Sequence, residues 1–92
     1  MIKTFKGGEV EELFADRRVA KFMEIERTAR RKLLLLNQAR NLQDLRNPPG
    51  NRLEALAGDR EGQYSIRIND KWRVCFRWDG HDAYDVEIVD YH

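Results

Sequence analysis

The chain has 92 residues, 41% of them hydrophobic and 36% charged, with a formal net charge of +1. This length predicts a single domain over residues 1–92, and the composition excludes a disordered chain. The net charge neither favours nor excludes a nucleic-acid partner. Cys75 is the single cysteine, so an internal disulfide is excluded and a buried thiol is expected. The longest aliphatic run, residues 33–36, is too short for a signal peptide or a membrane span, so we expect a cytoplasmic protein with no membrane partner.

The beginning of the chain predicts a short strand followed by a short helix. Residues 2–5 alternate apolar and polar side chains, which is typical of a strand. Val10, Leu13 and Phe14 then recur at helical spacing behind an acidic first turn, which favours a helix N-terminus.

The main helical region is expected over residues 19–45, because apolar side chains keep a helical period through most of it. Its last part, residues 39–45, can alternatively form a separate turn. The Pro-Pro-Gly run at residues 48–50 excludes both a helix and a central strand, so the chain must turn there.

After residue 50 the hydrophobic period changes from helical to two. Three amphipathic strands are predicted over residues 64–69, 72–78 and 84–88, joined as an antiparallel meander. The fold class is therefore α+β, with N-terminal helices packed on one face of a twisted antiparallel sheet.

Apolar residues must face each other across each hairpin, and this requirement predicts the register. The expected pairs are Ile68 with Trp72, Arg67 with Arg73, Trp78 with Tyr84, Val74 with Ile88, and Arg77 with Asp85. Arginine opposite arginine is destabilising unless an anion or a carboxylate lies between the two, so this pair indicates a phosphate site.

Arginine side chains on the sheet face away from the helices are the candidate phosphate ligands, since their forks bind phosphate bidentately. Arg73 and Arg67 are the candidates, whereas Arg77 is expected to be a solvated partner of Asp85. Arg60, in the glycine-framed loop 58–62, either reaches over the same sheet end or is neutralised by the acidic residues beside it.

The chain closes on Asp90, Tyr91 and His92, which offer groups for proton transfer. RNA cleavage by its own 2′-hydroxyl needs that proton removed, the phosphorane stabilised and the 5′-oxygen protonated, and arginines with such a cluster meet these needs without a metal. The alternative is a frayed end. The spacing of histidines, cysteine and acids matches no metal motif, and no cofactor is expected.

Five segments of the second half carry a resemblance to a known family. They are PPGNRLEAL at 48–56, GDR at 58–60, YSIRIND at 64–70, WRVCFRW at 72–78 and VEIVDYH at 86–92. The chain resembles the HigB-type (plasmid-maintenance killer) toxins of the RelE/ParE superfamily. The likeness spans the whole chain and is most specific over residues 48–92.

The resemblance implies a toxin of a type II toxin–antitoxin system, a metal-independent endoribonuclease that cleaves mRNA in the A site of the 70S ribosome. It implies a HigA-like antitoxin with a helix-turn-helix domain, and operator DNA bound only through that antitoxin. Arg73 would stabilise phosphate and His92 is a candidate acid or base. Asp90 and Tyr91 lie on the functional C-terminal segment.

Two positions depart from the family pattern. Glu54 stands where some members have a histidine, and Ala57 where some have a lysine. Glu54 can still act as a base but not as a cation, so the division of labour stays open. The hypothesis is a nuclease. Its catalytic candidates are Arg73, His92, Asp90, Tyr91 and Glu54. Its substrate-binding candidates are Arg60, Arg67 and Lys71. Two rivals are a ParE-like inhibitor of DNA gyrase and a non-enzymatic co-repressor acting with its antitoxin.

Overall fold

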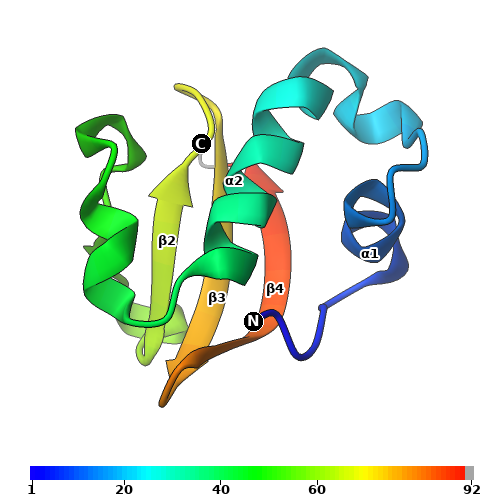
Figure 1. Cartoon of the computed structure of the whole chain (residues 1–92). Helices are drawn as coiled ribbons and strands as arrows, with labels where there is room; N and C mark the ends of the chain where they lie inside the picture. Colours follow the sequence, from blue (N-terminus) through cyan, green and yellow to red (C-terminus); the bar gives the residue numbers. More distant parts are fainter. Residues whose placement is uncertain (91–92) are drawn as a thin grey trace.

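A computed structural model describes residues 1–90, and the predicted site residues Tyr91 and His92 lie outside this range. Helices pack on one face of a four-stranded antiparallel sheet with strand order β1-β2-β3-β4 (Figure 1). The elements are α1 (Gly8–Phe14), α2 (Glu26–Gln38), β1 (Glu54–Ala55), β2 (Gln63–Arg67), β3 (Trp72–Asp79) and β4 (Asp82–Asp90). The predicted α+β class is confirmed.

The helical region expected as one unit is divided into three. A 3₁₀ helix at Ala20–Ile25 leads into α2, and a second 3₁₀ helix covers Leu42–Arg46. The chain leaves helical geometry at Ala39, whose ψ is 134°. A capping box between Asn41 and Asp44 then starts the next turn. The alternative of a separate turn after residue 38 is therefore the correct one. No helix within residues 1–90 is long and apolar enough to cross a membrane.

The first residues run along the outer edge of β4 instead of forming an independent strand. Ile2 and Phe5 make isolated parallel bridges to Ala83 and Val86. The Lys3 N–H donates to the Ala83 carbonyl at 2.8 Å. This segment covers part of an edge that would otherwise present unpaired backbone groups.

The first hairpin has the predicted register, with Arg67 opposite Arg73. The Ile68 N–H donates to the Trp72 carbonyl at 2.9 Å, as its predicted pairing requires.

The second hairpin is only partly as predicted. Val74 does lie opposite Ile88, but Trp78 pairs with Ala83 and Arg77 with Tyr84. A β-bulge shifts the register between Cys75 and Arg77. The extra residue on β4 is Asp85, which has a positive φ of 53°. Strand parity cannot reveal such an insertion, because the prediction assumed a regular ladder.

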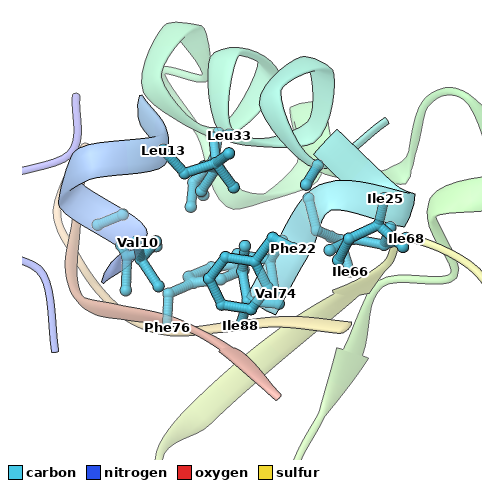
Figure 2. Close-up of a cluster of buried hydrophobic side chains, with 14 of the residues drawn as sticks. Val10, Leu13, Phe22, Ile25, Leu33, Ile66, Ile68, Val74, Phe76 and Ile88 are labelled. Atoms are coloured by element: carbon cyan, nitrogen blue, oxygen red, sulfur yellow. The ribbon is translucent and has the colours of Figure 1, made fainter. Parts of the chain in front are cut away.

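The core lies between the helices and the sheet (Figure 2). Leu13 and Leu33 from the helices meet Val74 and Phe76 from β3, and all four side chains are fully buried. Each buried side chain of this kind contributes about 1.5–3 kcal/mol of hydrophobic stabilisation. Trp72 and Trp78 pack against this core, in agreement with the inward parity predicted for them.

Candidate functional site

Arg73 lies on the sheet face away from the helices and is held by acceptors from three elements. Its Nε donates to the Ser65 hydroxyl at 2.8 Å, and Nη2 donates to the Arg52 carbonyl at 2.6 Å. Its Nη1 lies 3.6 Å from Glu54 Oε1. Although Arg73 is a cation, only 8% of its surface is exposed. A guanidinium bound on several sides is fixed in direction, which is what a group aimed at a phosphate requires.

Glu54 comes from a strand that the sequence prediction missed. Strand β1 has two residues, and it pairs Glu54 with Ser65 of β2. This pairing puts the Glu54 carboxylate on the same face as Arg73, with half of its side chain exposed. The site therefore combines a fixed cation with an accessible carboxylate, the pair of charges needed to bind a phosphate and accept a proton.

Arg67 faces Arg73 across the hairpin, and the expected repulsion is relieved by separate carboxylates. Arg67 Nη2 lies 2.5 Å from Asp70 Oδ1, while Arg73 has Glu54. The hydrogen bond from Arg67 lowers the pKa of the Asp70 carboxyl. Each arginine of the pair is thus compensated by its own carboxylate, whereas the prediction expected an anion or a carboxylate between the two.

Arg60 reaches the same sheet face from the loop after β1. Its Nη1 lies 3.1 Å from Glu87 Oε2 and also donates to Gln63. Lys6 Nζ lies 3.7 Å from the same Glu87 oxygen. The reading in which neighbouring acids neutralise Arg60 is wrong, because its carboxylate partner comes from β4.

Burial raises the pKa of the Cys75 thiol opposite Glu87, as expected for an inert structural cysteine.

Asp90 is placed away from the Arg73 face. It lies opposite Trp72, and its carboxylate is 3.6 Å from Lys71 Nζ. Val89 occupies the position opposite Arg73. Cross-strand partners point to the same face of a sheet, so Asp90 shares the inward face of Trp72 and not the face of Arg73. Arg77, as expected, is half exposed, with Nε 3.5 Å from Asp85 Oδ2.

The sequence prediction missed two groups that hold Arg73. Ser65 shares the period-two parity of Arg67 and Arg73, so the alternation could have identified it. The Arg52 carbonyl left no signal, because a backbone acceptor does not depend on residue type. Within residues 1–90 no group of three or more histidine, cysteine, aspartate or glutamate side chains is arranged to hold a metal.

Solved structures of bacterial toxins share this fold. A point mutant of YafQ from E. coli superposes with a TM-score of 0.62 at 12% identity, covering 98% of this chain and 93% of that one. The YoeB–YefM toxin–antitoxin complex from Staphylococcus aureus gives a TM-score of 0.58 at 18% identity, covering 100% and 98%. This chain therefore shares the arrangement of helices on a four-stranded sheet with both proteins.

Sequence comparison places the chain more narrowly. Residues 3–92 match the model of the RelE-like toxin of the type II toxin–antitoxin system HigB, and the chain belongs to this family. It is 39% identical over 80 residues to Toxin HigB-1 of Vibrio cholerae, covering 85% of this chain and 84% of that one. It is also 44% identical over 41 residues to Endoribonuclease HigB of Proteus vulgaris, a segment that covers 45% of each chain. The family resemblance predicted from the motifs is confirmed.

Proposed function

We propose that this toxin is a ribosome-dependent endoribonuclease that cleaves mRNA in the A site through attack by the 2′-hydroxyl. The relative from Proteus vulgaris is called an endoribonuclease, which supports RNA as the substrate. The observation that carries the proposal is Arg73, a nearly buried cation that donates to the Ser65 hydroxyl and the Arg52 carbonyl beside the half-exposed Glu54 carboxylate.

The chemistry needs no metal or cofactor. Glu54 accepts the proton of the 2′-hydroxyl while the 2′-oxygen forms its bond to phosphorus. Arg73 stabilises the added negative charge of the phosphorane, and a preorganised donor of this kind contributes about 100- to 1000-fold in rate. The bond from phosphorus to the 5′-oxygen then breaks, and that oxygen takes up a proton. The products are a 2′,3′-cyclic phosphate and a 5′-hydroxyl.

The remaining predicted site residues are assigned to leaving-group protonation and substrate binding. His92, with Tyr91, is the candidate acid for the 5′-oxygen, and both lie outside the described residues. Asp90 is assigned to orienting Lys71, because the two form an ion pair at the end of the sheet. Arg67 and Arg60 bind the RNA backbone. Their side chains lie on the same sheet face as Arg73, and each is about one-third exposed.

The partner in the cell is proposed to be an antitoxin with a helix-turn-helix domain, related to HigA. Membership of a type II toxin–antitoxin family supports an antitoxin partner. The toxin would contact operator DNA only through that partner, and no membrane takes part.

The test is primer extension on translating ribosomes with purified toxin, together with analysis of the cleaved 3′ end. We expect cleavage within A-site codons and a 2′,3′-cyclic phosphate. Arg73→Ala should lower the cleavage rate about 100- to 1000-fold, and Glu54→Gln by a similar or larger factor. Arg77→Ala is the matched control, because Arg77 lies on the same strand as Arg73 but makes an exposed ion pair of little energetic value.

Three outcomes contradict the proposal, and the last two would favour the rival functions. One is full toxicity and full cleavage in a folded Arg73→Ala variant. Another is intact mRNA combined with inhibited DNA supercoiling, which would assign the chain to the gyrase inhibitors. An absence of growth arrest without antitoxin would leave only the co-repressor role.

A further inference from the structure

A short loop connects the helical layer to Arg73. The backbone of Arg52 adopts left-handed geometry, with φ 46° and ψ 58°, directly after the 3₁₀ turn Pro49–Asn51. This conformation points the Arg52 carbonyl at Arg73, which donates to it at 2.6 Å. A non-glycine residue in this region is strained unless its surroundings hold it.

Asn51 holds this loop from inside the protein. It is fully buried, and its side-chain Nδ2 donates to the Leu45 carbonyl at 3.2 Å and to the Asn47 carbonyl at 3.1 Å. Its backbone N–H donates to the Pro48 carbonyl at 2.9 Å. These bonds hold Asn51 against the preceding residues 45–48, and its peptide bond leads directly into Arg52.

Lys32 of α2 completes the connection. Its Nζ donates to Asn51 Oδ1 at 2.5 Å, and only 9% of the residue is exposed. No carboxylate lies within ion-pair distance of Lys32 in the part of the chain that the structure describes. Burial, together with Arg31 and Arg67, lowers the pKa of the Lys32 ammonium. A methionine or leucine would cover the core here without this electrostatic cost, so packing alone does not explain a lysine.

We propose that Lys32 and Asn51 are positioning residues for Arg73, acting through the Arg52 carbonyl. Helix α2 packs in the core, and the hydrogen bond from Lys32 holds the Asn51 side chain in a fixed position relative to this helix. Asn51 fixes the geometry of Arg52, and the Arg52 carbonyl fixes one edge of the guanidinium. This inference rests on the proposed function, because it assigns Arg73 to the reaction. Displacement of a reacting group by about 1 Å can cost about 100-fold in rate.

The test combines kinetics with a double-mutant cycle on the full chain. Lys32→Met keeps the apolar stem and removes the donor. We expect the cleavage rate at saturating toxin to fall about 10- to 100-fold per folded molecule, with half-saturation unchanged within about twofold. In an Arg73→Ala background, Lys32→Met should have no further effect, because the group that it positions is gone. Arg31→Met, next on α2 and exposed, is the matched control for loss of a positive charge and should change half-saturation only.

A spectroscopic measurement separates this inference from the proposed function. The Arg73 Nη2–H that donates to the Arg52 carbonyl should exchange slowly with solvent in the native protein, and much faster in Lys32→Met. This signal does not depend on activity, so it is informative even if Arg73→Ala proves active and the proposed function fails. Should Lys32→Met not fold, Lys32→Gln replaces it, since its amide retains a shorter donor, with the same effects at smaller size.

The inference is overturned by any of three results. The first is an Arg73 Nη2–H signal that stays protected in the variant. The second is a full cleavage rate in the folded variant. The third is that Lys32→Met loses the same factor with and without Arg73. The last result would show that the Lys32–Asn51 pair acts on the fold as a whole.

Discussion

At the scale of single residues, the site depends on how one buried cation is compensated. The Arg73 guanidinium is removed from water, and the hydrogen bonds that it donates to the Ser65 hydroxyl and the Arg52 carbonyl replace part of its hydration. Lysine could not substitute, because its single ammonium cannot reach two acceptors in fixed directions. Every buried side-chain nitrogen and oxygen in the described residues has a partner. Loss of one acceptor around Arg73 would therefore leave a buried donor unsatisfied.

Ser65→Ala tests this compensation. The change removes the buried acceptor at 2.8 Å from Arg73 Nε and leaves a charged N–H unsatisfied. We expect the free energy of unfolding to fall by about 1–3 kcal/mol, measured by urea denaturation. In an Arg73→Leu background the same change should cost close to nothing, because the donor is absent. An equal cost in both backgrounds would show that Ser65 acts through packing.

At the scale of elements, β4 shows how one residue can change a face of the sheet. The bulge at Asp85 moves residues 82–84 by one position against β3, while Val74 and Ile88 keep the register on the other side of it. The Asp85 N–H donates to the Thr4 hydroxyl at 2.8 Å, so the N-terminal segment is held at the same point. Arg77 reaches Asp85 along a diagonal, which is why their ion pair forms without direct pairing.

A matched pair of substitutions measures the strain at the bulge. Asp85→Gly and Asp85→Ala both remove the carboxylate, but only alanine keeps a Cβ at the positive φ of 53°. We expect Asp85→Ala to be less stable than Asp85→Gly by about 1 kcal/mol, after allowing for the greater freedom of glycine in the unfolded chain. Thermal unfolding of the two proteins gives this difference directly. Equal stability, or a more stable alanine variant, would contradict it.

At the scale of the whole molecule, acid should weaken the fold through its hydrogen-bonded carboxylates. Backbone N–H groups of Asn41 and Arg40 lower the pKa of Asp44, and Arg67 lowers the pKa of Asp70. A carboxyl with a lowered folded pKa stabilises the protein fully above its unfolded pKa, and this stability is lost as the pH falls through the folded pKa. Stability should therefore decrease below pH 3.8, the ordinary value for both groups.

Urea denaturation over a pH series measures this loss, and Asp44→Asn is the comparison. This variant lacks one of the two groups, so its stability should depend less steeply on pH in the acid range. Identical slopes for both proteins would show that the Asp44 carboxylate contributes nothing to folding.

The sequence predicted the elements whose apolar side chains follow a regular period. It failed where an element is too short to show a period or where a single residue interrupts one. Strand alternation identified three strands, the inward Trp72 and the pairing of Arg67 with Arg73. It missed β1, because two residues carry no period, and it missed the bulge, because Asp85 looks like any exposed strand residue. The Arg73 site depends on Glu54 of β1 and on the Arg52 backbone carbonyl. Residue patterns therefore located its arginine but not the groups that hold it.

The pairing of residues 2 and 5 with residues 83 and 86 has a meaning for how the chain is made. Contacts between such distant positions form late, because closing a large loop costs conformational entropy. During synthesis α1 and α2 emerge first, with their apolar faces uncovered until β2, β3 and β4 follow. We therefore expect the nascent chain to lack an assembled Arg73 site until translation has passed β4.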